Sequence, residues 1–179
     1  MDLIHRCQVG DEQAFAALFH KYKNLVYKTA YLMLGDAYEA EDVLQEVFVQ
    51  VCKSLNVYDP EKGAFTTWLH RITVNRCLNW RRKRRPSLSL DRVHISLPSP
   101  EGRMEEKAVW QAVRGLSEKL RAVVVLRYYW ELSYAEIAQI LDIPLGTVKS
   151  RLNLALKTLR KDLEAEKASA KTRLSQQEV

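Results

Sequence analysis

The chain has 179 residues, of which 47% are hydrophobic, and its 28 Lys and Arg against 22 Asp and Glu give a net charge of +6. This apolar content is enough to build cores, which excludes wholesale disorder, and no apolar run approaches the roughly 20 residues of a membrane span. The first residues do not resemble a signal peptide, and three widely separated cysteines indicate neither a disulfide framework nor a zinc site. We therefore expect a cytoplasmic protein with no cofactor, no metal and no stable membrane association of its own.

Charge is unevenly distributed along the chain. Residues 1–60 hold nine acidic and five basic side chains, whereas residues 61–92 hold two acidic and nine basic ones. A basic segment beside an acidic one suggests that a polyanion binds at one place and a basic partner at another.

The first part of the chain has the pattern of three helices. Asp11 is placed to cap a helix that ends at Gly35, and Asp36 to cap a second one, both with apolar residues at spacings of three and four. A loop at residues 56–64 follows. The third helix then ends in five consecutive basic residues at 81–85.

The second part is also helical. Residues 86–102 are rich in Ser and Pro and lack a helical period, which predicts a linker. Further on, Ser133 and Glu136 form a capping-box sequence that opens a short helix to Leu141. A tight turn and a final helix to about Glu164 follow. No segment shows the alternation of a half-buried strand together with hairpin turn residues, so the prediction is all-α.

The strongest local signal is this short helix, tight turn and longer helix. The residues predicted to be buried on the longer helix are Val148, Leu152, Ala155, Leu156 and Leu159. The opposite, polar stripe contains Thr147, Ser150, Arg151, Leu154, Lys157, Thr158 and Lys161. Hydroxyl and basic groups exposed on the second helix of such a pair are what insertion into a DNA major groove requires. The alternative is an ordinary amphipathic hairpin with a solvated face.

A second stripe runs along the helix that comes after the 56–64 loop. Its members recur at spacings of three and four: Trp68, Arg71, Asn75, Asn79 and Arg82. Aromatic, amide and guanidinium groups on one side of a helix can stack on unpaired bases, read base edges and hold phosphates. The alternative is that Trp68 and Trp80 are core residues and the basic run is merely solvated.

A third signal is acidic. Glu39, Asp42, Gln45 and Glu46 gather on one side of the second predicted helix, opposite its apolar stripe. Such a patch is usually a solvated surface. In a DNA-binding protein, however, it repels DNA and more plausibly meets a basic protein surface.

In their order and spacing, four motifs resemble those of bacterial RNA polymerase sigma factors of the extracytoplasmic-function (ECF) subfamily, the minimal two-domain type. The matching stretches are Gly10-Asp11-x-x-Ala14-Phe15, Ala40-Glu41-Asp42-Val43-x-Gln45-Glu46-x-Phe48, Phe65-x-Thr67-Trp68-Leu69-x-Arg71-Ile72-x-x-Asn75, and Leu132-Ser133-Tyr134-x-Glu136-Ile137-Ala138 with Gly146-Thr147-Val148-Lys149-Ser150-Arg151. The resemblance implies two small helical domains: a sigma region 2-like domain at 1–88 and a sigma region 4-like helix-turn-helix domain at 105–165. A flexible linker at 89–104 would join them, and a flexible tail would occupy 166–179.

The resemblance also implies partners and site residues. Core RNA polymerase would be bound through its β′ clamp helices and β flap, and an anti-sigma factor would regulate the chain. The polymerase-binding residues would be Glu39, Asp42, Gln45 and Glu46. The promoter −10 element would be held by Tyr58, as the stacking residue of the 56–64 loop, and by Trp68, Arg71, Asn75, Arg76, Asn79, Arg81 and Arg82. The −35 element would be read by Thr147, Lys149, Ser150, Arg151, Leu154 and Lys157.

Other functional classes fit the sequence less well. The four histidines are scattered, and no Gly-rich phosphate loop, nucleophile elbow or metal-ligand spacing supports an enzyme. A dimeric repressor or response-regulator effector would need a sensory domain and a dimer face. The stripe from Trp68 to Arg82 argues against such a DNA-binding dimer and against an adaptor that binds only protein. Side chains suited to reading single-stranded nucleic acid would serve neither class.

Overall fold

The computed structural model describes the backbone of residues 3–84 and 104–177 and the side chains of residues 3–80 and 109–165. Within these ranges the chain forms α-helices, with short 3-10 and π-helical turns and no strand, which confirms the all-α prediction. Residues 89–103 of the linker expected at 89–104, and the side chains of the basic run at 81–85, lie outside the described residues, and Met104 already begins a helix.

The amino-terminal unit contains four helices, and the caps expected from the sequence form two of its corners. The helices are α1 (Leu3–Gln8), α2 (Glu12–Leu34), α3 (Ala37–Ser54) and α4 (Phe65–Arg84). The Asp11 and Asp36 side chains accept hydrogen bonds from backbone N–H groups at the starts of α2 and α3, at 3.0 and 2.9 Å. Gly35 ends α2 in the left-handed conformation, with φ of 79°.

The helix α1 was not predicted from the sequence, although it positions the loop between α3 and α4. That loop consists of two 3-10 turns, η1 (Leu55–Val57) and η2 (Pro60–Lys62). The Gln8 side-chain amide donates to the carbonyl oxygens of Leu55 and Tyr58, at 3.0 and 3.1 Å. The amino-terminal residues therefore fix the start of the loop.

The carboxy-terminal unit is also helical. It contains α5 (Met104–Gly115), α6 (Glu118–Val124), a π-helical turn η3 (Val125–Tyr129), α7 (Tyr134–Leu141) and α8 (Leu145–Gln177). The predicted capping box is present: the Ser133 hydroxyl accepts from the Glu136 N–H at 3.2 Å, and the Glu136 carboxylate accepts from the Ser133 N–H at 2.8 Å.

The last helix is longer than the sequence suggested. We expected α8 to end near Glu164 and a flexible tail to begin at residue 166, but the helix continues to Gln177. Residues 160–177 contain no Gly or Pro and are dominated by good helix formers such as Ala, Lys and Glu. Because adding a residue to an existing helix costs far less than starting one, nothing in this stretch stops propagation.

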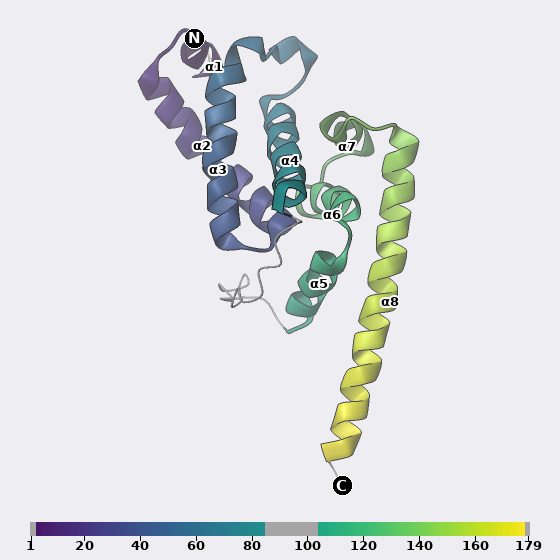
Figure 1. The fold of residues 1–179 in the computed structure, drawn as a ribbon. Coiled ribbons are helices and arrows are strands. Elements are labelled where there is room, and N and C mark those ends of the chain that lie inside the picture. Colours follow the sequence, from purple (N-terminus) through teal and green to yellow (C-terminus); the bar gives the residue numbers. More distant parts are fainter. Residues whose placement is uncertain (1–2, 85–103, 178–179) are drawn as a thin grey trace.

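The two units pack against each other. Figure 1 shows α6 and α7 between α4 and the long rod of α8, whose carboxy-terminal end projects beyond the other helices. One apolar core runs through both units: it includes Val47 of α3, Leu69 of α4, Leu126 of η3 and Ile137 of α7. A smaller cluster, including Val113, Ala155 and Leu159, joins α5 to α8.

A buried arginine also links the units. Arg121 of α6 is 2% exposed. Its guanidinium donates to the carbonyl oxygens of Met33 at 2.5 Å, Leu116 at 2.9 Å, Val113 at 3.2 Å and Arg114. These acceptors lie at the carboxy-terminal ends of α2 and α5 and in the turn after α5, where helical carbonyls lack partners within their own helix. Arg121 therefore joins the end of α2 to the second unit.

Candidate nucleic-acid interface

The pairing of α7 and α8 has the form of a helix-turn-helix. Ile137 and Ile140 of α7 are buried in one core with Val148 and Leu152 of α8. Between the helices, Asp142 adopts the left-handed conformation, with φ of 53° and ψ of 51°, which Asp tolerates better than most residues. These contacts fix how α8 is held against α7.

The polar stripe of α8 is accessible along the first half of the helix. Lys149, Ser150 and Lys157 are exposed, and Leu154 is 54% exposed, whereas Thr147 and Arg151 are half-buried. The Ser150 hydroxyl donates to the Thr147 carbonyl oxygen at 3.1 Å, which leaves its lone pairs available to accept. The structure thus brings the six residues predicted to read the −35 element onto one helix.

For one residue of α8, the prediction that it is buried is wrong. Val148, Leu152, Ala155 and Leu159 are buried as expected, but Leu156 is 44% exposed. Leu156 lies at the edge of the apolar stripe, outside the cluster that α5 and α6 form with Ala155 and Leu159.

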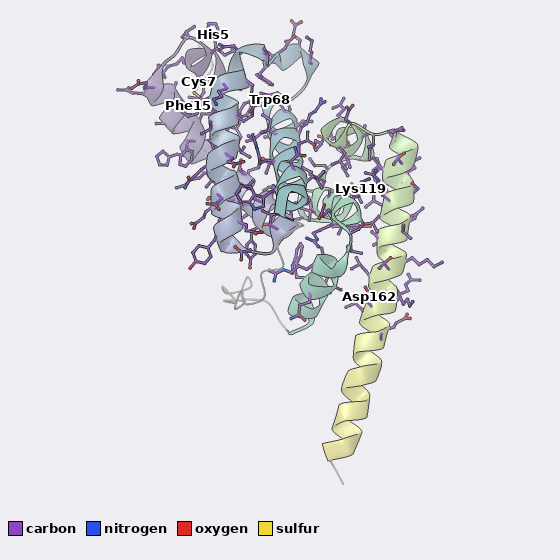
Figure 2. All side chains as sticks on the ribbon, viewed as in Figure 1. His5, Cys7, Phe15, Trp68, Lys119 and Asp162 are labelled. Atoms are coloured by element: carbon purple, nitrogen blue, oxygen red, sulfur yellow. The ribbon has the colours of Figure 1, made fainter. Side chains whose placement is uncertain are left out.

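The second stripe lies on α4. Arg71, Asn75 and Asn79 are exposed, and the two asparagines are one turn apart, so their side-chain amides are neighbours. Trp68 is half-buried near the amino-terminal end of α4, where Figure 2 labels it. The helix extends through Arg81 and Arg82, but their side chains are outside the described residues.

The prediction that Tyr58 presents its ring to a flipped base does not fit the structure. Tyr58 is 7% exposed. Its ring packs against Phe65 and Trp68, with centroids 5.4 Å apart in both cases, and its hydroxyl donates to the Gly63 carbonyl oxygen at 3.0 Å. The side chain therefore anchors the loop. The sequence could not show this, because the position depends on packing between the loop and α4.

The residues that the loop does expose are different ones. Val57 is 78% exposed, and Asn56 beside it is also exposed. No sequence pattern marked these two residues, since neither belongs to a periodic stripe.

The acidic residues of α3 line a groove against α4. Asp42 and Gln45 are exposed and Glu46 is half-buried. The groove has a volume of about 550 Å³, and its walls are Asp42, Gln45, Glu46, Val49, Gln50, Lys53, Arg76 and Trp80. Glu39 lies nearer the start of α3, where its N–H donates to Asp36.

Arg76 belongs to this groove as well as to α4. Its Nη1 lies 3.3 Å from the Glu46 Oε2. The sequence grouped Arg76 with the residues that hold DNA backbone, but in the structure it neutralises part of the acidic patch. Asp42 and Gln45 are exposed whereas Glu39 and Glu46 are half-buried, so the first two are the more accessible members of that patch.

Two further properties bear on the class of site. Among the described residues, no helix combines the length and apolar character that crossing a bilayer requires. Within the same residues, no group of three or more His, Cys, Asp or Glu side chains is arranged to hold a metal ion.

Comparison with known proteins accounts for both units. Residues 18–86 match the Sigma-70 region 2 family, and residues 106–159 match the Sigma-70 region 4 family. The ECF RNA polymerase sigma factor SigW of Bacillus subtilis is 36% identical over 177 residues, which covers 89% of this chain and 94% of SigW. The ECF RNA polymerase sigma-E factor of Escherichia coli is 35% identical over 169 residues, covering 84% and 86%.

Solved structures show the same fold at lower identity. CnrH, determined in complex with the cytosolic domain of CnrY, has a TM-score of 0.69 and 24% identity, and the match covers 91% of this chain and 96% of CnrH. RpoE of Bartonella quintana, determined with the anti-sigma factor NepR, has a TM-score of 0.71 and 21% identity, covering 84% and 96%. With the two region matches and relatives at 35–36% identity over most of its length, the chain belongs to the extracytoplasmic-function family of RNA polymerase sigma factors, which are transcription initiation factors and not enzymes.

Proposed function

We propose that this chain recruits core RNA polymerase to promoters by using three separate surfaces at once. The observation that carries the proposal is their separation: an acidic groove on α3 and α4, an amide and arginine stripe on another side of α4, and a basic and hydroxyl stripe on α8. Acidic groups repel DNA, so the groove is left for a protein, while the two stripes suit nucleic acid.

The groove is the proposed docking site for the β′ clamp helices of core polymerase. Asp42 and Gln45 are exposed at its edge, and Val49 and Trp80 supply apolar lining. An apolar floor with charged groups at the rim is the usual composition of a protein interface. Glu39 and Glu46 would extend the negative potential that steers a basic partner toward α3.

The α4 stripe is the proposed site for the unpaired non-template strand of the −10 element. Asn75 and Asn79 can each donate and accept, which suits them to base edges. Arg71, Arg81 and Arg82 would hold the DNA backbone. In the loop, the exposed side chains of Asn56 and Val57 are better placed to contact a base than the buried side chain of Tyr58. The Trp68 ring packs against the Tyr58 ring and so supports the loop.

The α8 stripe is the proposed reader of the duplex −35 element. Arg151 would contact base edges, with Thr147, Ser150 and Leu154 beside it in the major groove. Lys149 and Lys157 would hold phosphates. The same unit would contact the β flap, which would place α8 at a fixed distance from the polymerase active site.

We also propose that the chain works in the cytoplasm under the control of an anti-sigma factor. The solved structures of CnrH and RpoE both contain a second protein, the cytosolic domain of CnrY and the anti-sigma factor NepR respectively. Inhibition of the same kind would keep this chain from polymerase until a signal releases it.

A charge-reversal experiment tests the docking site. Asp42→Lys should weaken capture of core polymerase by the full chain at least tenfold, because it reverses charge at an exposed interface position where coupled charge pairs contribute about 1.5 kcal/mol or more. The matched control is Asp162→Lys, an exposed carboxylate on α8 away from the groove.

Binding constants from immobilised core polymerase and the far-UV circular dichroism of each variant complete the test. We expect a folded Asp42→Lys variant with weakened binding and an Asp162→Lys variant that binds like the parent. Equal binding by the parent and a folded Asp42→Lys variant would remove the groove from the proposal.

A further inference from the structure

The two units meet along a seam whose contacts come from residues far apart in sequence. Arg71 of α4 lies 3.8 Å from Asp142 at the end of α7. Arg114 of α5 donates to the Tyr31 hydroxyl of α2 at 3.1 Å. Arg121 of α6 donates to the carbonyl oxygen of Met33.

A histidine is buried in this seam. His70 of α4 is 2% exposed, and its ring lies 5.0 Å from the Trp130 ring, just past η3 in the other unit. Among the described residues, no group hydrogen-bonds to the His70 Nδ1 or to the Trp130 indole N–H. A neutral imidazole can leave Nδ1 as an unused acceptor. An imidazolium would place a charged N–H donor there with nothing to accept it, which is far more costly.

The charged groups around His70 do not offset the cost of burying a protonated ring at this position. Glu136 of α7 is the carboxylate whose charge favours the protonated ring, but it is already bonded to Ser133. Asp142 of α7 faces Arg71, and Glu46 of α3, which also packs against α4, faces Arg76. From α2, the titratable Tyr22 packs on Phe65 at the start of α4. Burial therefore dominates, and it lowers the pKa of His70 from 6.5 to about 4.

We propose that the seam is a proton-sensitive clasp: neutral His70 permits the two units to pack together, and its protonation separates them while each unit stays folded. Separation would also release Arg71 from Asp142, and so free the amino-terminal part of the α4 stripe. Because the arrangement of the two units can be measured without DNA or polymerase, failure of this proposal is distinguishable from failure of the proposed function.

The direction and size of the pH effect follow from the linkage between proton binding by His70 and separation of the two units. The closed arrangement disfavours the proton, so its advantage is complete above pH 6.5 and is lost as pH falls from 6.5 toward 4. If separation returns His70 to water and to its ordinary pKa, the ratio of open to closed molecules rises about tenfold between pH 7.5 and pH 5.5. The same relation limits the total rise of this open-to-closed ratio to roughly 300-fold at lower pH.

Single-molecule fluorescence energy transfer on the full chain can measure that ratio. One dye would be placed on Cys52, which is exposed on α3, and the other on an Asp162→Cys substitution in α8, with Cys7→Ser removing the half-buried thiol. We expect the ratio of low-transfer to high-transfer molecules to rise about tenfold from pH 7.5 to pH 5.5. Far-UV circular dichroism should show the same helix content at both pH values.

Three variants assign the effect to His70. His70→Phe keeps an aromatic ring without a titrating group and should abolish the pH response, whereas His20→Asn, at an exposed histidine of α2, should keep it. Arg71→Gln leaves His70 intact and should raise the open population at both pH values while keeping the roughly tenfold change, which preserves the test if His70→Phe does not fold.

Three results would overturn the proposal. They are an open population that does not change with pH in the parent, a pH response that persists in a folded His70→Phe variant, and a loss of helix content that accompanies the low-transfer population.

Discussion

At the scale of single residues, the contacts that decide the structure are those a sequence pattern does not mark. Arg121 lies among hydrophobic residues on α6, and the pattern predicts no more than a helix there. The structure buries its guanidinium against four carbonyl oxygens, three at the ends of α2 and α5 and one in the turn after α5, and the helix dipoles at those ends favour a positive charge.

Replacing Arg121 tests whether this contact stabilises the protein. Arg121→Met fills similar space but removes the donor to the carbonyl oxygens of Met33, Arg114 and Leu116, whereas the Val113 carbonyl keeps the Leu116 N–H. At about 1–3 kcal/mol for each unsatisfied buried group, and with partial rescue by water, the free energy of unfolding should fall by roughly 3 kcal/mol. Urea denaturation measures it, with Arg160→Met on the exposed side of α8 as the control. A loss no larger than in the control would contradict the capping role.

Tyr58 offers a second residue-scale test, because its burial corrects a prediction about function. Tyr58→Phe removes the hydroxyl bond to Gly63 and keeps the buried ring, so stability should fall by about 1 kcal/mol. The affinity of the chain–polymerase complex for single-stranded −10 DNA should not change. Tyr38→Phe, at an exposed tyrosine of α3, is the matched control for stability. Weaker strand binding by Tyr58→Phe without loss of stability would restore the residue to the DNA interface.

At the scale of elements, helix starts were predictable and some helix ends were not. Asp11, Asp36 and Ser133 mark their helices because a short polar side chain satisfies N–H groups that only the first turn leaves free. The end of α8 had no equivalent marker after Glu164. The loop position of Tyr58 and the exposure of Leu156 depend on neighbouring elements, which periodicity along one helix does not describe.

The capping box of α7 gives an element-scale prediction with a pH dependence. Ser133→Ala should cost about 1 kcal/mol of stability at pH 7, because it removes the hydroxyl that accepts from the Glu136 N–H. Ser117, the N-cap of α6, makes no such side-chain bond, so Ser117→Ala should cost much less.

Hydrogen bonds from Ser133 lower the pKa of Glu136. Its stabilising contribution is therefore present above the ordinary value of 4.5 and is lost as pH falls through the lowered value. Urea denaturation at pH 7 and pH 3 should show the cost of Ser133→Ala shrinking at low pH. A cost that is independent of pH would show that the carboxylate does not take part.

The polar stripe of α8 gives a prediction about promoter reading. Arg151→Ala should weaken binding of the polymerase holoenzyme to its own −35 sequence by about 1–3 kcal/mol and relax sequence preference. Lys157→Ala should weaken binding to all duplexes and reduce its salt dependence. Mobility shifts on matched and scrambled −35 duplexes at several salt concentrations separate the two. If both variants lost affinity equally on both duplexes, Arg151 would not be a reader.

At the scale of the whole molecule, one core joins two units that carry different surfaces. The sequence predicted the two units and the residue types of each surface. It did not predict their packing, because the seam is made by pairs such as His70 and Trp130 that no periodic pattern connects. That packing leaves the groove of α3 and the stripe of α8 accessible while Asp142 engages Arg71 of the α4 stripe.

The most direct test of the central claim is transcription from a library of genomic fragments by core polymerase, with and without the full chain, followed by mapping of RNA 5′ ends. We expect a discrete set of start sites that appear only with the chain. Upstream of these sites should lie two shared elements, near −10 and −35. Start sites that are the same with and without the chain, or that share no upstream element, would contradict the proposed function.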